Sequence, residues 1–147
     1  MRKTVARQGG VRRRALDLAR VLLVHGDLAP RLALQTILEA GGYLVDAAAS
    51  PAEALSKLDE GQYELVLTDS RLGAETAGRN ILAYARVKDY HPATAMITGS
   101  HLSLRVPGDK HEVSIYAENL PLFLGKVAEL IGMRASRRYP AALRQAV

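Results

Sequence analysis

The stretch that decides the fold is Tyr-Glu-Leu-Val-Leu-Thr-Asp at residues 63–69. Its apolar run is short and ends on a carboxylate, which is typical of a strand that is buried on both faces and delivers Asp69 to a loop. The same interpretation applies to residues 20–25, Arg-Val-Leu-Leu-Val-His, which are followed by Gly26 and Asp27. Both stretches predict central strands of a parallel sheet.

Segments with helical spacing of apolar residues separate these strands. Pro30 suits the first turn of a helix that Gly41-Gly42 ends, and residues 50–53, Ser-Pro-Ala-Glu, form a capping box with proline at the first helical position. Further strands are predicted at residues 43–47, 93–98 and 112–116, and further helices at residues 79–87 and 119–133. The alternation predicts an α/β domain with a doubly wound, five-stranded parallel sheet and helices on both faces.

Right-handed crossovers bring the carboxyl ends of all such strands to one edge of the sheet, where ligands and chemistry collect. The residues expected at this edge are His25, Gly26, Asp27, Asp69, Ser70, Arg71, Thr98, Gly99 and Tyr116.

The composition limits the possible chemistry and location of the protein. The 147 residues are enough for one domain, and cysteine is absent, which excludes disulfides, thiolate metal sites and cysteine nucleophiles. No apolar run is long enough to span a membrane. We therefore expect a cytoplasmic protein without a membrane span.

Charge divides the chain into three parts. Residues 1–19 contain six basic residues and one acidic residue, for a net charge of +5, and are predicted to be a basic N-terminal extension. Residues 20–133 contain ten basic and fourteen acidic residues, for a net charge of −4, and form the expected domain. Residues 134–147 contain four arginines and no acid, for a net charge of +4, and form a basic C-terminal tail. Such tails are either solvated or make non-specific contacts with nucleic acid.

Five short fragments, in order and at matching intervals, resemble the receiver domain of the response-regulator family, as in the chemotaxis regulator. They are Arg-Val-Leu-Leu-Val (20–24), Leu-Glu-Ala-Gly-Gly-Tyr (38–43), Ser-Pro-Ala-Glu-Ala-Leu (50–55), residues 63–69 and Ala-Met-Ile-Thr-Gly (95–99). The resemblance covers residues 20–133. It implies a flavodoxin-like receiver fold and a role in two-component signalling, with a histidine kinase or a downstream signalling protein as the partner.

The resemblance also implies roles for individual residues. Asp69 occupies the position of the phosphoacceptor, and Thr98 that of the hydroxyl that binds the phosphoryl group. Gly99 is the small neighbour that keeps the pocket open, and the Arg71 carbonyl would bind Mg²⁺ together with Asp69. The alternatives are an aspartate that interacts with a helix N-terminus and a threonine that merely favours a strand.

Several family positions hold other residues here. The acidic pair that binds Mg²⁺ is replaced by His25 and Gly26, and Asp27 is expected to point away from the pocket. Imidazole suits Mg²⁺ poorly, so any metal site should be weak or absent. The family's lysine falls at Tyr116, and a short interval containing Pro107-Gly108 predicts a shortened, irregular or missing fourth helix.

The resemblance also places His25 and Asp69 at the ends of neighbouring central strands. A protonated His25 could pair with an ionised Asp69, or a neutral ring could bond to backbone instead.

Several functions are compatible with these features. A degenerate receiver that acts through protein–protein interaction, without enzymatic activity or cofactor, is favoured, because phosphoryl transfer depends on the missing charges. The alternative is a receiver that a histidine kinase still phosphorylates on Asp69. A small doubly wound enzyme is disfavoured, since no Gly-rich phosphate loop follows the first strand. A nucleic-acid adaptor would rely on its basic tails alone.

Overall fold

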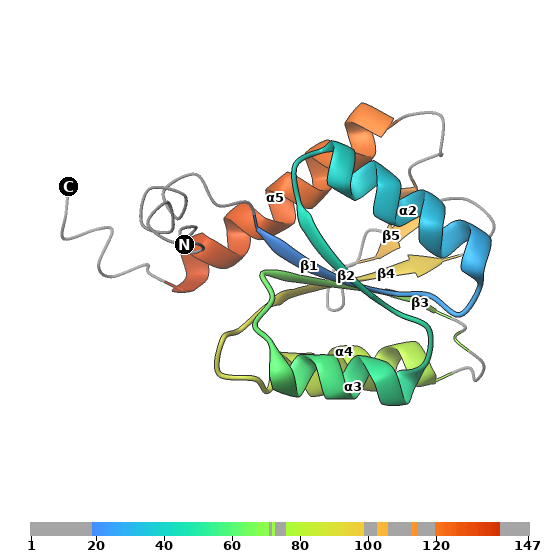
Figure 1. Cartoon of the computed structure of the whole chain (residues 1–147). Helices are drawn as coiled ribbons and strands as arrows, with labels where there is room; N and C mark the ends of the chain where they lie inside the picture. The colour runs from blue at the N-terminus through green and yellow to red at the C-terminus, as the bar shows by residue number, and fades with distance from the viewer. Residues whose placement is uncertain are drawn as a thin grey trace, which may run out of the picture.

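The structure is a computed structural model that describes residues 19–70, 72, 76–98, 103–105, 113–114 and 120–138. Figure 1 shows one central sheet that lies between two layers of helices. In chain order, the described elements are β1 (Arg20–Val24), α2 (Leu28–Ala40), β2 (Leu44–Ala48), α3 (Pro51–Glu60), β3 (Leu65–Asp69), α4 (Ala77–Arg86), β4 (Ala93–Thr98), β5 (Ser103–Arg105), β6 (Val113–Ser114) and α5 (Leu120–Arg138).

Four neighbouring strands of the sheet are parallel, as the sequence predicts. The strand order is β2-β1-β3-β4-β5-β6, and β1 lies between β2 and β3. Parallel pairing aligns Val24 with Ala48 on one side and with Thr68 on the other, and Asp69 pairs with Ile97 of β4. The carboxyl ends of these strands therefore lie at one edge of the sheet.

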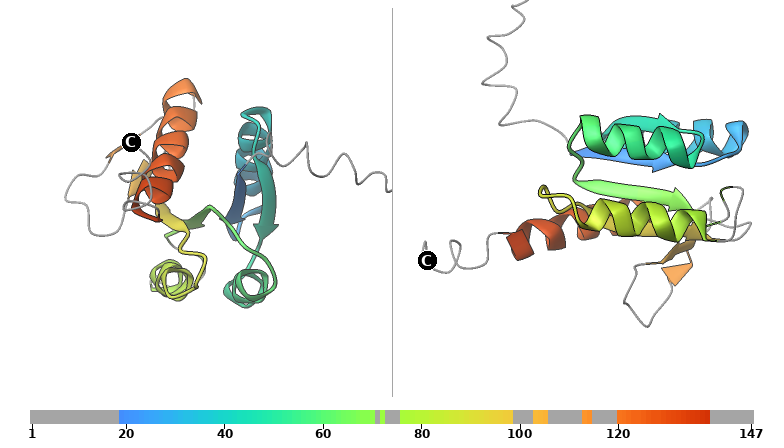
Figure 2. Two further views of the ribbon diagram at one scale, coloured as in Figure 1. Left: turned by 90° about the vertical axis from the view of Figure 1, so that its left-hand side faces the viewer. Right: turned by 90° about the horizontal axis from the view of Figure 1, so that it is seen from below.

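Side chains of the central strands alternate between two hydrophobic cores. Val21 and Leu23 pack on the face covered by α2 and α5, together with Phe123 from α5. Leu22 and Val24 pack on the opposite face, which α3 and α4 cover. The left view in Figure 2 shows the two helical layers on opposite sides of the sheet.

The rest of the sheet differs from the prediction of five parallel strands. β5 pairs antiparallel with β4, and β6 pairs antiparallel with β5, so the sheet has six strands among the described residues. A parallel neighbour of β4 would need a crossover of about a dozen residues or more, whereas an antiparallel one can follow a short turn. Only residues 99–102 connect β4 to β5, so the chain returns antiparallel.

This return lies in the interval where the receiver family has its fourth helix. The sequence predicts that the helix between the fourth and fifth strands is shortened, irregular or missing, and residues 103–105 of this interval form a strand. Between β4 and α5, the described residues contain no helix. The predicted strand at 112–116 is present as β6, but β5 separates it from β4.

The predicted start of α3 is confirmed, whereas the last helix is longer than predicted. Ser50 Oγ accepts a hydrogen bond from the Glu53 amide at 3.2 Å, and Pro51 begins α3. α5 continues to Arg138, past the domain boundary expected at residue 133. In the described part of the chain, no helix has the length and apolar character needed to cross a membrane.

Candidate functional site

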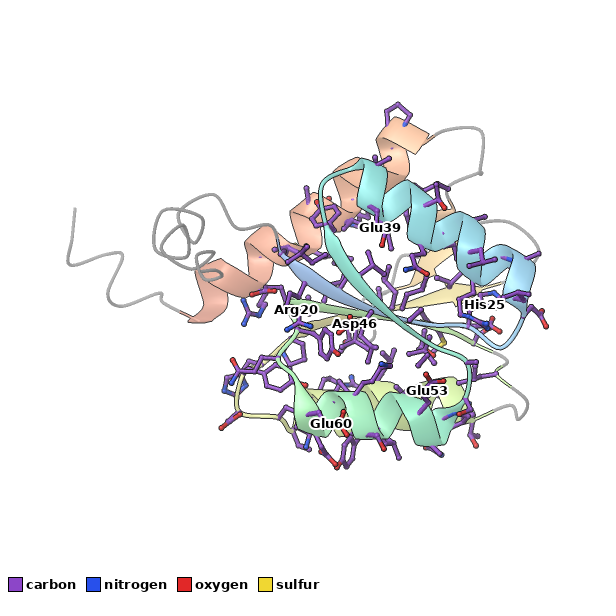
Figure 3. The ribbon with its side chains drawn as sticks, viewed as in Figure 1. Arg20, His25, Glu39, Asp46, Glu53 and Glu60 are labelled. Atoms are coloured by element: carbon purple, nitrogen blue, oxygen red, sulfur yellow. The ribbon has the colours of Figure 1, made fainter. Side chains whose placement is uncertain are left out.

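The candidate site lies at the carboxyl edge of the sheet, where β1 and β3 end side by side. Val24 and Thr68 are partners in the sheet, so the residues that follow them, His25 and Asp69, reach the same level. His25 Nδ1 lies 4.0 Å from Asp69 Oδ2, and the two side chains are only 11% and 19% exposed. The expectation that these residues end neighbouring central strands is confirmed, and Figure 3 shows His25 at this end of the sheet.

Backbone contacts fix the His25 ring. Its own amide donates to the Ala48 carbonyl at 3.0 Å, which holds the residue beside β2. Its Nδ1 accepts a hydrogen bond from the Asp27 amide at 3.2 Å. A nitrogen that accepts an N–H bond carries no proton, so this geometry suits a neutral ring with its hydrogen on Nε2. To pair with Asp69 through Nδ1–H, a protonated ring would have to give up the bond from Asp27.

An arginine that the sequence did not single out also contacts this histidine. Arg31, in the first turn of α2, donates from Nη1 to the His25 carbonyl oxygen at 2.9 Å. The bond joins α2 to the end of β1. The sequence does not predict this contact, because the contact depends on the path of the loop between β1 and α2.

Gly26 and Asp27 add no second carboxylate beside Asp69. A Cβ at position 26 would lie 3.7 Å from Leu72 Cδ1 and 4.0 Å from the Ala49 carbonyl oxygen. Leu72 is buried and belongs to the core beneath α3 and α4. Asp27 is exposed at the N-cap of α2, and its side chain makes no capping hydrogen bond there.

The backbone around Asp69 is held on three sides. The Ser70 amide donates to the Ile97 carbonyl at 3.0 Å, which ties the end of β3 to β4. Thr68 is fully buried, and its Oγ1 donates to the Asp69 carbonyl at 3.2 Å. Gly78, in the first turn of α4, approaches that same carbonyl so closely that a Cβ would lie 2.6 Å from the oxygen. The carboxylate therefore projects from a rigid strand end.

The other predicted site residues are described less fully. Thr98 is the last residue of β4, one position beyond the partner of Asp69, so its backbone lies at the same edge. Arg71, Gly99 and Tyr116 lie outside the described residues. Tyr116 follows β6, and β6 is separated from β4 by β5, so this strand does not end beside β4.

The donor set does not fit the Mg²⁺ ion that the family resemblance implies. Mg²⁺ takes oxygen ligands in octahedral geometry and is usually held through carboxylates. Here Asp69 supplies one carboxylate, Gly26 has no side chain, and the Nδ1 lone pair of His25 accepts the Asp27 amide. Among the described residues, no three His, Asp or Glu side chains form a group that could hold a metal ion.

Comparison with solved structures identifies the fold. A CheY-like response regulator receiver domain protein from Methanospirillum hungatei superposes with a TM-score of 0.63 at 22% identity, over 82% of this chain and 98% of that one. The receiver domain of NtrC4 from Aquifex aeolicus gives a TM-score of 0.59 at 20% identity, over 78% of this chain and 98% of that one. This chain has the fold of a response-regulator receiver domain. No family model matches the sequence, and no curated protein matches it.

Within this receiver fold, the position of Asp69 at the end of β3 agrees with the resemblance in sequence. A further similar structure, response regulator TrrA from Thermotoga maritima in complex with Mg²⁺-BeF, gives a TM-score of 0.50 at 27% identity, over 55% of this chain and 70% of that one. Two features differ from the family pattern. His25 stands at the end of β1, on one side of β3, and on the other side β5 extends the sheet beyond β4.

Proposed function

We propose that this protein is a degenerate receiver that takes part in two-component signalling through protein–protein interaction and not through metal-dependent phosphorylation. The receiver fold supports the signalling context. The observation that carries the proposal is the contact at His25, whose Nδ1 accepts the Asp27 amide while facing Asp69 at 4.0 Å. The imidazole of His25, which stands in place of a metal-binding carboxylate, is thus already hydrogen-bonded to the backbone of the loop that follows it.

The electrostatics of phosphoryl transfer support the same conclusion. A phosphoryl group that approaches an ionised Asp69 brings further negative charge, which has to be neutralised in the transition state. In metal-dependent transfer, Mg²⁺ supplies that neutralisation when it is bound, but the donors around Asp69 suit it poorly. Thr68, Ser70 and Gly78 hold the backbone of this residue, and none of these contacts supplies a cation.

The altered edge of the sheet favours a partner different from that of a phosphorylation-driven receiver. In the receiver family, the fourth helix, fifth strand and last helix form the partner-binding face. Here, β5 takes the place beside β4, so a surface built on that family pattern is absent among the described residues. We propose a signalling protein as the partner and assign the chain no enzymatic reaction.

The test is incubation of the whole protein with acetyl phosphate, with and without Mg²⁺, followed by intact-mass measurement. The proposal predicts no Mg²⁺-dependent phosphoryl adduct on the wild-type chain. Asp69→Asn serves as the control for the site of modification, because it keeps the side-chain shape and removes the acceptor oxygen. The double variant His25→Asp with Gly26→Asp serves as the positive control, because it restores two carboxylates beside Asp69.

A Mg²⁺-dependent adduct on the wild-type chain that disappears in Asp69→Asn would overturn the proposal. That result would establish the alternative, a receiver that is still phosphorylated on Asp69. An adduct that persists in Asp69→Asn would show modification elsewhere and leave Asp69 without an acceptor role.

A further inference from the structure

The outer face of α5 carries side chains at the spacing of a helix–helix contact. Two large apolar side chains of this helix are open to solvent, Leu122 with 57% and Met133 with 43% of its surface exposed. Lys126 and Glu129 lie between them, so the four residues follow one another at intervals of four, three and four positions. This alternation of four and three is the spacing with which paired helices contact each other. We call these four residues the α5 seam.

The opposite face of α5 packs against the domain itself. Phe123, Val127 and Leu130 are buried in the core between α5 and the sheet. The left view of Figure 2 shows α5 in the same helical layer as α2. On the outer side, Gly125 and Gly132 border the seam, and no described atom lies within 4 Å of a Cβ built at either position. The described part of the chain therefore leaves the seam uncovered.

Two opposite charges lie in the middle of the seam. Lys126 Nζ is 3.4 Å from Glu129 Oε1 on the same helix, and Glu129 is exposed. An exposed pair of this kind contributes little to the stability of a single helix. Charged or polar residues within an apolar helix contact instead select the register and orientation of the two helices. The positions of these two charges therefore distinguish one way of pairing from another.

The seam is symmetric about the middle of residues 122–133. Leu122 and Met133 are equally far from this midpoint, and so are Lys126 and Glu129. If a second copy of α5 lies antiparallel across a twofold axis at the midpoint, Leu122 meets Met133 of that copy. The same arrangement places Lys126 against Glu129 of the second copy, so opposite charges meet twice. A parallel copy would instead place each charge against an identical charge, which is unfavourable. The seam is complementary to itself only in the antiparallel orientation.

We propose that the α5 seam is a homodimer interface, in which two copies of the chain pair antiparallel about a twofold axis. Such a contact uses the same patch on both subunits, as twofold interfaces do. The seam is about 17 Å long at 1.5 Å per residue. Three turns of helix bury less than the roughly 1,200–2,000 Å² of stable complexes, so the dimer is weak and depends on concentration. The proposal goes beyond the function proposed for Asp69 and does not depend on it.

The first experiment is sedimentation equilibrium of the whole protein from about 10 μM to about 1 mM, a range that covers weak association. The wild-type protein should change from monomer to dimer within this range. Leu122→Ser with Met133→Ser should weaken dimerisation about tenfold or more, because each copy then loses two apolar side chains from the contact. The matched control is Leu28→Ser with Leu32→Ser, which removes two similarly exposed apolar side chains from α2 and should leave dimerisation unchanged.

Charge reversal tests the pairing of Lys126 with Glu129 of the second copy. Lys126→Glu and Glu129→Lys should each weaken the homodimer about tenfold or more, because four like charges then meet at the twofold axis. A mixture of these two single variants should form a heterodimer. The double variant Lys126→Glu with Glu129→Lys should recover the homodimer, because the exchange preserves complementarity. Recovery in the mixture and in the double variant separates a specific contact from a general effect of net charge.

Disulfide cross-linking tests the orientation of the two helices. The chain contains no cysteine, so an introduced thiol is unique. A mixture of Leu122→Cys and Met133→Cys proteins should form a disulfide-linked heterodimer under mild oxidation, and intact mass identifies it. Each cysteine variant alone should form far less linked dimer, because the antiparallel contact separates identical residues by the length of the seam.

Four results would overturn the proposal. The first is a wild-type protein that remains monomeric at about 1 mM, and the second is an equal loss of dimer in the α2 control. The third is charge reversal without recovery in the mixture and the double variant. The fourth is self-linking of Leu122→Cys as efficient as linking in the mixture, which would indicate a parallel pair. Thermal unfolding of each variant confirms that the domain is intact, and the outcome at Asp69 with acetyl phosphate does not affect these tests.

Discussion

Gly78 of α4 lies against the backbone of Asp69, and a Cβ at position 78 would be 2.6 Å from the Asp69 carbonyl oxygen. Gly78→Ala should therefore destabilise the domain by about 1–3 kcal/mol, because the start of α4 or the end of β3 has to shift. Urea denaturation measures the loss, and the Asp69 amide resonance reports the displacement. Gly125→Ala is the matched control: nothing lies within 4 Å of its Cβ position in α5, so alanine there should stabilise the protein slightly. Equal stability in both variants would contradict the close approach.

The carboxylates missing beside Asp69 can be restored. We predict that the wild-type protein shows no saturable Mg²⁺ binding at sub-millimolar concentration, and that His25→Asp with Gly26→Asp gains such binding. A Cβ at Gly26 meets only ordinary van der Waals neighbours, Leu72 Cδ1 at 3.7 Å and the Ala49 carbonyl at 4.0 Å, so there is room for a Cβ at this position. An NMR titration with Mg²⁺ that follows the resonances around Asp69 measures both proteins.

The matched control for this gain is His25→Asn with Gly26→Asn, which has similar shape without the charges. Without metal, the acidic variant should be less stable than the amide variant, because its carboxylates repel Asp69. If the resonances around Asp69 in the wild-type protein shifted and saturated at sub-millimolar Mg²⁺, His25 and Gly26 would not weaken the metal site.

A buried tyrosine should make the domain sensitive to alkali. Burial, and then a 2.7 Å hydrogen bond to the Asp46 carboxylate, raises the pKa of Tyr63 well above its usual value. Its stabilising contribution is therefore complete below the unfolded pKa of about 10 and is lost as the pH rises through the folded pKa. Tyr63→Phe should cost about 1–2 kcal/mol near neutral pH and flatten the decline above about pH 10. Chemical denaturation at several pH values tests this, and an unchanged alkaline slope would contradict it.

The ion pair between Asp59 of α3 and Lys88, which follows α4, should contribute to acid sensitivity. Hydrogen bonds from Lys88, and then from Tyr84, lower the pKa of Asp59 below its usual value. The contribution of Asp59 is thus present above the unfolded pKa of about 3.9 and is lost as the pH falls through the lower folded pKa. Asp59→Asn should make stability fall less steeply in acid, and the difference should shrink in high salt, because the pair is exposed. If the difference in stability between Asp59→Asn and the wild type did not change with salt, it would come from lost side-chain packing and not from the ion pair.

Much of the fold was predictable because several local signals agree. Residues 20–24 and 65–69 are short apolar runs followed by polar residues, and they form the two strands that end at His25 and Asp69. The Ser50 capping box begins α3 as expected. The resemblance to receiver domains places the first and third strands side by side, and parallel register then brings the residues at their carboxyl ends to one level. The approach of His25 to Asp69 could therefore be predicted from that resemblance.

The strand at residues 103–105 could not be predicted in the same way. Ser-Leu-Arg is too short to show an alternating pattern, and only its pairing with β4 makes it a strand. The contacts of Arg31 and Leu72 also depend on how loops pass over the sheet, which periodicity does not report. Gly78 carried a weak signal, since a glycine at the start of a helix often marks a close backbone approach.

The antiparallel return from β4 to β5 also bears on how this domain reaches its native state. Every parallel neighbour in the sheet is joined through a helix, so pairing of β1 with β2 and of β3 with β4 has to await closure of a long loop. Ile97 of β4 pairs with Leu104 of β5, only seven positions further along the chain, and hairpins of such local strands close in about 1–10 μs. Lower contact order at this edge favours early formation of the β4–β5 hairpin, on which the remaining strands can then assemble.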